Sequence, residues 1–199
     1  MKESDGKPGE KWRVFIAIDI PKEIRERIAQ HIASLRGEAP DVRASWNREE
    51  NVHLTLNFLG DVPINRLEVL SQAAEQSAQQ LSSFPISVEG CSAFPNRGSP
   101  RVLWIGIEDP VGALNRLHDS LEENCARAGF AREKRRFNPH LTIARLRQPQ
   151  GARHLADLHQ QKGFEKAVFL AEDLSLIRSE LSSNGSRYTT LARHGFVAG

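Results

Sequence analysis

Two histidines in this sequence stand in the same short motif. His53 begins His-Leu-Thr-Leu within NVHLTLNFLG, and His140 begins His-Leu-Thr-Ile within NPHLTIARL. An unperturbed imidazole has a pKa of about 6.5, so a pair can hold one neutral and one protonated ring near neutral pH. The neutral ring can then take a proton from a nucleophile while the protonated ring gives one to a leaving oxygen.

A threonine follows each histidine at the second position, as Thr55 and Thr142. Side chains alternate along a strand, so each threonine shares a face with its histidine, as Asn57 does in the first motif. Two imidazoles and two hydroxyls around one small volume suit phosphoester cleavage, because hydroxyls can stabilise the phosphoryl oxygens. This chemistry requires no metal, no cofactor and no covalent intermediate. A single His-x-Thr is more often structural, so the repetition carries the prediction.

The surroundings of the two motifs repeat as well. Arg13 begins an apolar strand 40 positions before His53, and Arg101 begins a similar strand 39 positions before His140. A helix and a loop lie in between each time. The pattern predicts an internal duplication of a β-α-β unit, with 12–60 and 100–146 as the equivalent units.

The other elements follow from hydrophobic periodicity. Helices are predicted over 22–35, 64–81, 111–128 and near 154–161, and strands over 12–20, 51–60, 83–91, 101–110, 137–146, 166–179 and 186–196. We expect residues 1–11 to form a disordered leader and 12–199 to form a single domain, because no linker divides the chain.

Composition sets further limits. A net charge of +2 is too small to predict a broad duplex-binding face. No apolar run approaches the roughly 18 residues that span a bilayer, so no membrane association is expected. Cys91 and Cys125 lie outside any Cys-x-x-Cys and are expected to be free, which suggests a cytoplasmic location. Zinc-type Cys/His spacing, a Walker loop and a Gly-x-Ser-x-Gly elbow are all absent from the sequence.

At this point the sequence resembles a known family. HLTLNFLG and HLTIARL, with RVFIAIDIP, AFPNRGSPRVLWIGI, KRRFNPHLTIAR and RSELSSNGSRYTTL, are similar to the 2H phosphoesterases. The closest likeness is to the RNA 2′,3′-cyclic phosphodiesterases, also called 2′-5′ RNA ligases. The resemblance implies an α+β, bilobal fold. Two pseudo-symmetric antiparallel sheets would line a central cleft, with helices packed outside.

The resemblance also implies a reaction. RNA ending in a 2′,3′-cyclic phosphate, such as a tRNA fragment, or a small cyclic nucleotide would be hydrolysed to a 2′-phosphomonoester without metal by a monomeric enzyme. It implies His53 as the proton donor and His140 as the proton acceptor. Thr55 and Thr142 match phosphate-binding threonines, and Arg145 matches a basic residue that follows the second motif.

Phe58 and Arg145 present a geometric difficulty. Each lies five residues after its histidine, so strict alternation places it on the opposite strand face. A bulge at the motif ends, or a reach around the strand edge, would bring them to the phosphate. Arg145 could then clamp it and Phe58 could stack on a base. For Phe58, packing in the core is the simpler expectation.

Two alternatives use the same residues. The site could join RNA ends of tRNA halves through a 2′-5′ linkage, because an acid and a base can exchange roles in the reverse reaction. The protein could instead be an RNA-end binding module, with both histidines as phosphate ligands. The basic run REKRR (132–136) fits either a solvated face or a contact with phosphate.

Overall fold

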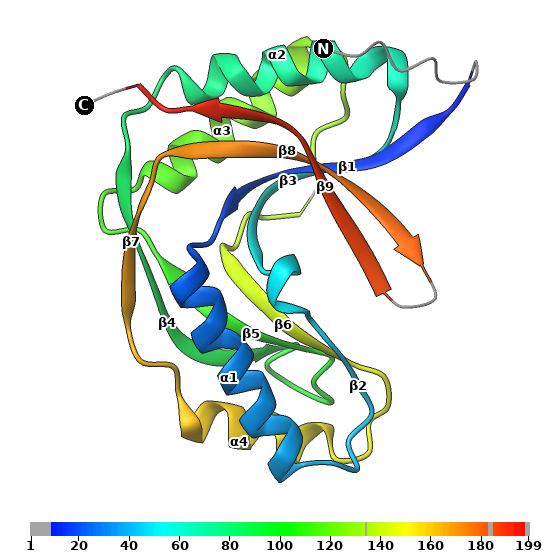
Figure 1. Ribbon diagram of the computed structural model, residues 1–199, viewed down its shortest axis with the longest axis vertical. Helices are drawn as coiled ribbons and strands as arrows, with labels where there is room; N and C mark the ends of the chain where they lie inside the picture. The colour runs from blue at the N-terminus through cyan, green and yellow to red at the C-terminus, as the bar shows by residue number, and fades with distance from the viewer. Residues whose placement is uncertain (1–8, 134, 183–184, 198–199) are drawn as a thin grey trace.

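The protein folds around two antiparallel β-sheets, seen in the computed structural model, which describes residues 9–133, 135–182 and 185–197 (Figure 1). The strands are β1 (Lys11–Asp19), β2 (Ala44–Trp46), β3 (His53–Pro63), β4 (Phe84–Phe94), β5 (Val102–Glu108), β6 (His140–Leu146), β7 (Ala167–Ala171), β8 (Asp173–Ser182) and β9 (Gly185–Gly195). The helices are α1 (Lys22–Glu38), α2 (Leu67–Ala78), α3 (Ala113–Arg127) and α4 (Ala152–Lys162), with 3-10 turns η1 (Glu49–Asn51) and η2 (Ile64–Arg66). The expected α+β class with two antiparallel sheets is confirmed.

The two sheets share one strand arrangement. The first sheet has the order β3-β1-β8-β9, and the second has β6-β5-β4-β7 with β2 added beside β6. Asp19 is the strand partner of His53, and Gly106, 87 positions later, is the partner of His140, itself 87 positions after His53. By strand pairing, a residue of the first unit corresponds to the residue 87 positions later. The sequence match of Arg13 with Arg101 implied an offset of 88, which is one residue more.

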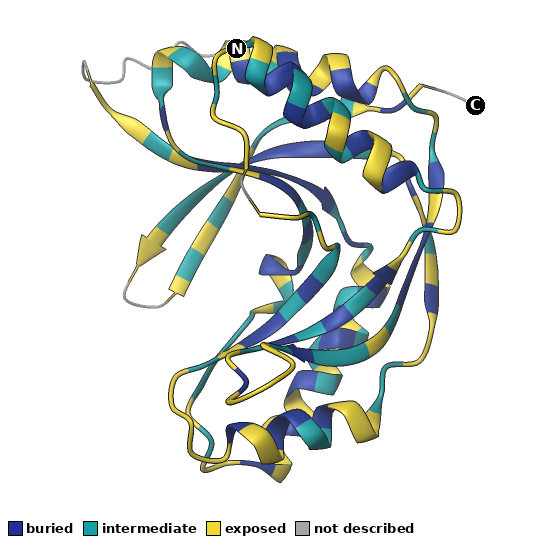
Figure 2. Cartoon of the chain, turned by 180° about the vertical axis from the view of Figure 1, so that it is seen from behind, coloured by how far each residue is buried: buried dark blue, intermediate teal, exposed yellow. Residues whose placement is uncertain are grey.

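The helix that follows a strand of one sheet packs against the other sheet. α2 and α3 cover the first sheet, whereas α1 and α4 cover the second, although α1 follows a strand of the first sheet and α3 a strand of the second (Figure 1). One hydrophobic cluster contains buried residues from both sheets and all four helices. Figure 2 shows buried residues along the strands and on the inner sides of the helices. This exchange joins both halves through a single core.

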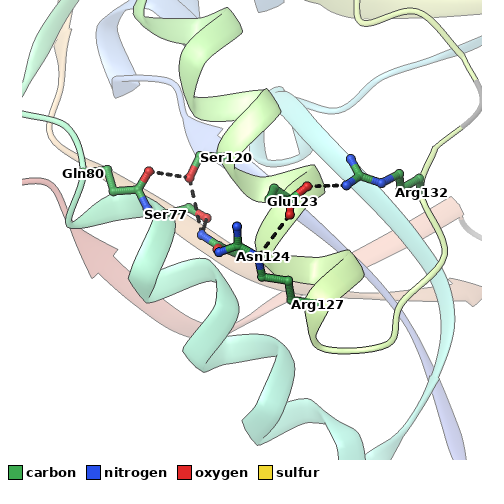
Figure 3. Close-up of polar contacts among 7 residues, drawn as sticks. All are labelled: Ser77, Gln80, Ser120, Glu123, Asn124, Arg127 and Arg132. Carbon is green, nitrogen blue, oxygen red and sulfur yellow. Dashed lines mark hydrogen bonds and ion pairs between the residues drawn. The ribbon is translucent and has the colours of Figure 1, made fainter.

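Polar contacts join α2 to α3, and α3 to the loop that leads to His140. Asn124 donates a hydrogen bond to Ser77 across the helix pair, at 2.8 Å (Figure 3). Glu123 on α3 pairs with Arg132, which lies in the loop leading to His140 (Figure 3). Part of the basic run is therefore held against α3, and Arg132 is used structurally.

Three local differences from the predicted elements have physical causes. The strand predicted over 166–179 is two strands, because the chain leaves the second sheet after β7 and enters the first at β8, with Glu172 between them. β6 begins at His140 and not at 137, since Pro139 has no N–H to donate to a ladder. β2 was not predicted, because a strand of three residues has too short a pattern.

The N-terminal end of the described chain is ordered from close to its start. The predicted leader falls mostly on 1–8, which lie outside the described residues, but Glu10 already accepts a backbone hydrogen bond from Ile64 and β1 starts at Lys11.

Cys91 and Cys125 are free, as predicted. Within the described ranges, no helix combines the length and apolar character that crossing a membrane requires.

A substitution at Gly106, the strand partner of His140, tests how closely the strands of the second sheet pack there. A Cβ added there would lie 2.5 Å from the backbone oxygen of Glu89, so the strands would have to move apart. We expect Gly106→Ala to lower the free energy of unfolding by about 1–3 kcal/mol in urea denaturation. Gly37→Ala is the matched control, because no atom lies within 4 Å of its added Cβ in α1. It should be neutral or stabilising by up to about 1 kcal/mol. Equal stability of both variants would contradict this account.

Candidate active site

The two histidine strands carry the same local distortion. From His53 and from His140, the next five residues show an identical sequence of half-buried, buried and exposed positions. In β3 the register against β1 shifts after Thr55, so that Leu56 is one extra residue on the histidine strand. In β6 the register against β5 shifts after Thr142, and Ile143 is the extra residue. Each motif therefore contains a one-residue β-bulge directly after its threonine.

The first bulge moves Phe58 out of the core. Beyond an extra residue the alternation of side chains is reversed, so Phe58 comes to the face of His53, which we call the histidine face. Its ring is 41% exposed, and the guanidinium of Arg13 lies 4.8 Å above it. The prediction that Phe58 packs in the core is therefore wrong.

The same bulge removes Asn57 from the site. We expected Asn57 beside His53 and Thr55, but it is only 1% exposed and lies on the opposite, helix-covered face. Its side chain donates a 2.6 Å hydrogen bond to Glu122 of α3. Strict alternation failed because the sequence does not mark the bulge.

The second bulge acts on Arg145 as the first does on Phe58. Arg145 is exposed, whereas its neighbour Ala144 is buried. The positive charge of Arg145 is close enough to His140 to lower the pKa of that imidazole. The geometric difficulty of the sequence is thus resolved by a bulge and not by a side chain reaching around an edge.

Both imidazoles are held by the backbone carbonyl two residues earlier. Nδ1 of His140 lies 2.7 Å from the carbonyl oxygen of Asn138, and the backbone of Asn51 makes a hydrogen bond to His53. When Nδ1 donates to a carbonyl, Nε2 keeps its lone pair for proton transfer. Sequence reasoning missed this contact, although Asn-x-His occurs in both motifs and is the signal that could have revealed it.

His53 lies in an apolar enclosure. Its ring stacks on Phe15 with centroids 4.6 Å apart, and Tyr188 meets it edge-on at 5.1 Å. Burial lowers the pKa of His53 to about 4, against smaller opposing effects of the Asn51 backbone and the Asp19 carboxylate. In the free protein His53 is therefore neutral at pH 7. Neither aromatic partner was predicted from the sequence.

His140 lies in a different environment. Phe94 meets its ring edge-on at 5.3 Å, and Trp104 lies at 6.1 Å. Burial lowers the pKa of His140, the carbonyl of Asn138 raises it, and the charges of Arg145 and Arg135 lower it further. Arg135 comes from the basic run, so part of that run acts on the site.

Two pairs of equivalent positions, Asp19 with Gly106 and Phe58 with Arg145, make the two halves electrostatically unequal. Asp19 is the strand partner of His53, whereas Gly106, without a side chain, is the partner of His140. The carboxylate favours an imidazolium at His53. The nearby guanidinium of Arg145 favours a neutral ring at His140.

Asn47 connects the two motifs directly. Its side-chain amide donates to the carbonyl of Thr142 at 3.0 Å and to that of Asn51 at 3.2 Å. Its backbone N–H donates to the bulged Ile143 at 2.8 Å. β3 and β6 contact each other, and the chain between β2 and β3, which carries Asn47, links them. Figure 1 shows the two strands near each other.

Comparisons with known proteins identify the family of this chain. A family model described as the 2′-5′ RNA ligase superfamily matches residues 20–182. The RNA 2′,3′-cyclic phosphodiesterase of Archaeoglobus fulgidus is 36% identical over 180 residues, covering 90% of this chain and 97% of that one. The protein of the same name from Escherichia coli is 31% identical over 184 residues, covering 92% and 96%.

Solved structures give the same result for the fold. TT0787 of Thermus thermophilus matches with a TM-score of 0.77 and 25% identity, covering 94% of this chain and 98% of that one. E. coli LigT complexed with 3′-AMP matches with a TM-score of 0.70 and 26% identity, covering 94% and 99%.

The ionisation of His53 can be followed by NMR. We expect its imidazole to stay neutral until about pH 4 in the free protein. Asp19→Asn should lower that pKa further, because it removes a charge that favours the imidazolium. Inorganic phosphate should raise it. Since the unfolded chain takes up this proton at about 6.5, the free energy of unfolding should fall as the pH falls from 6.5 to 4. A His53 that titrates near 6.5 without ligand would contradict the enclosure.

Proposed function

The chain belongs to the 2′-5′ RNA ligase superfamily, and from this premise we propose that it hydrolyses 2′,3′-cyclic phosphate ends of RNA to 2′-phosphomonoesters. The observation that carries the proposal is the pair of bulged strands, each presenting one carbonyl-held imidazole and one threonine on its histidine face. Relatives of 31% and 36% identity over nine-tenths of the chain carry the name of this activity, which supports it.

The two histidines divide the proton transfers. His140 takes a proton from water through Nε2, and the water oxygen attacks phosphorus. His53 gives its proton to the departing 3′ oxygen, so the P–O3′ bond breaks while the 2′ ester remains. The difference between Asp19 and Gly106 supports this assignment, as does Arg145 beside the base. Exchange with solvent then restores both rings.

The substrate itself prepares His53 as an acid. A cyclic phosphodiester carries one negative charge. At about 4 Å and an effective dielectric of about 20, that charge is worth about 4 kcal/mol to an imidazolium. About 1.4 kcal/mol corresponds to one pKa unit, so the anion offsets most of the desolvation that keeps His53 neutral in the free protein. Binding and protonation are therefore coupled, and His53 becomes an acid when the phosphate arrives.

The remaining side chains hold the substrate. The hydroxyls of Thr55 and Thr142 donate to the nonbridging phosphate oxygens, and Arg145 supplies a charge-assisted contact. Phe58 is exposed on the same face as His53 and offers a ring for base stacking. No metal or cofactor takes part in these steps.

The proposal includes the setting of the enzyme. Residues 12–199 act as one bilobal domain built on the duplication of 12–60 in 100–146, and the enzyme works as a monomer. It acts in the cytoplasm, where RNA fragments occur and where free Cys91 and Cys125 stay reduced. Joining of tRNA halves through a 2′-5′ linkage would use the same site, with the 5′-hydroxyl of one half in place of water as the nucleophile that opens the cyclic phosphate. The high concentration of water makes hydrolysis dominate.

Replacement of either histidine tests the mechanism. We expect His53→Ala and His140→Ala each to lower kcat for an oligonucleotide 2′,3′-cyclic phosphate by about 10²–10⁴-fold, since each removes one proton transfer. Circular dichroism should show folded variants, and His154→Ala, at an exposed position of α4, should keep full activity. EDTA should leave the rate unchanged. Full activity of either site variant, or a 3′-phosphate product, would overturn the proposal.

The assignment of acid and base can be tested with a second leaving group. A phosphodiester that releases p-nitrophenolate needs little proton donation, because phenolate is a much weaker base than an alkoxide. We expect such a substrate to restore much of the rate to His53→Ala but not to His140→Ala, which still cannot activate water. Rescue of His140→Ala alone would reverse the two roles.

A further inference from the structure

Three metal-binding side chains converge behind the second sheet. His31 from α1, His159 from α4 and Cys91 from β4 place one donor atom each within 4.8 Å of the others. Nε2 of His31 lies 2.8 Å from Nδ1 of His159 and 4.0 Å from Sγ of Cys91. Across the described ranges, this is the only such convergence of three His, Cys, Asp or Glu side chains.

The orientation of His159 fits a metal ligand. Its Nε2 lies 3.0 Å from the backbone oxygen of Trp104, to which an Nε2–H donates. Nδ1 then carries a lone pair aimed at the cluster, on a side chain with no solvent exposure. Metal-binding histidines in proteins commonly have their second nitrogen held by a carbonyl in this way.

The cluster is separate from the catalytic histidines. The register of β4 against β5 shifts between Glu89 and Cys91, after which Cys91 pairs with Ile105. Ile105 is fully buried and belongs to the core under the helices. His31, Cys91 and His159 therefore lie on the helix-covered side of the second sheet, with the sheet between them and His140.

We propose that His31, Cys91 and His159 form a Zn²⁺ site that fastens α1 and α4 to β4, with a water as fourth ligand. Zinc bonds of about 2.0–2.1 Å to nitrogen and about 2.3 Å to sulfur place tetrahedral N···N pairs about 3.3 Å apart and N···S pairs about 3.6 Å apart. The 2.8 Å pair needs to open, and the 4.0 Å pair to close, by about half an ångström each. The third pair, Sγ of Cys91 and Nδ1 of His159, lies within 4.8 Å and needs to close by up to about 1.2 Å.

The chemistry of the donors selects the metal. Two imidazoles and one thiolate suit Zn²⁺ and not Mg²⁺ or Ca²⁺, which require oxygen ligands. Burial lowers the pKa of His31 to about 4 and lowers that of His159, so both rings are neutral ligands. Burial raises the pKa of Cys91 to about 12, so zinc must displace the thiol proton and release it to solvent.

The charges around the cluster offset each other. The ammonium of Lys162 opposes a cation near His31, but it is paired with Glu38 at 2.5 Å. His31 gives up its hydrogen bond to His159, and its ring proton moves from Nε2 to Nδ1. One proton per zinc therefore leaves the protein, and it comes from Cys91. This site does not depend on the proposed catalytic function.

Cobalt and zinc titration of the full chain tests the proposal. We expect one Co²⁺ to bind per chain, with tetrahedral d–d bands and thiolate-to-cobalt charge-transfer absorption that Zn²⁺ abolishes. At a free zinc concentration about 100 times Kd, the melting temperature should rise by about 5 °C or more relative to EDTA. An unchanged melting temperature together with an absent cobalt spectrum in the native chain would overturn the proposal, whatever the variants do.

Matched variants assign the ligands. Cys91→Ser should abolish the charge-transfer band, whereas Cys125→Ser, the other free cysteine, should keep it. His31→Gln should weaken binding at least about 100-fold, whereas His154→Gln on α4 should not change it. A charge-transfer band retained in Cys91→Ser would place the metal elsewhere. Hydrolysis of a cyclic phosphate by Cys91→Ser in EDTA should match wild type, so failure of the zinc site and failure of the catalytic proposal are distinguishable.

Discussion

The site depends on one extra residue in each histidine strand. A regular strand from His53 would direct Phe58 into the core and Asn57 toward the substrate. In β6, it would bury the guanidinium of Arg145, at a cost that only a paired charge could offset. The bulges at Leu56 and Ile143 avoid this outcome. Each bulged residue is itself buried, so it anchors the strand in the core while it re-aims the residues that follow.

The duplicated frame makes two like imidazoles, and a few positions outside the motif make them unlike. The carbonyl contacts of Asn51 and Asn138 are equivalent, and so are the threonines. Asp19 against Gly106 breaks the equality, because only one ring faces a carboxylate. In the proposed mechanism, an acid and a base thus differ through their neighbours, while both side chains remain histidines.

The sequence predicts what is local or repeated. The helices, most strands and both His-x-Thr motifs follow from periodicity and duplication. The change of sheet at Glu172 was not predictable, because an apolar run looks the same whichever sheet it joins. The bulges have no residue signature, which is why Asn57 was misplaced. Tyr188 and Asn47 reach the site through tertiary contacts from distant segments, and no spacing within the motifs indicates them.

Zinc spacing in the sequence is likewise a local pattern, whereas His31, Cys91 and His159 come together only because α1 crosses to the second sheet and packs beside α4. One face of that sheet thereby carries His140 and the other carries the proposed zinc ligands. Trp104 belongs to both, since its ring lies beside His140 and its backbone oxygen accepts from His159. A zinc ion on the helix-covered face of the sheet would stabilise the strand that carries Trp104, beside His140, the proposed base. It would take no part in the reaction. The proposed hydrolysis without metal and the proposed structural zinc are therefore compatible in one chain.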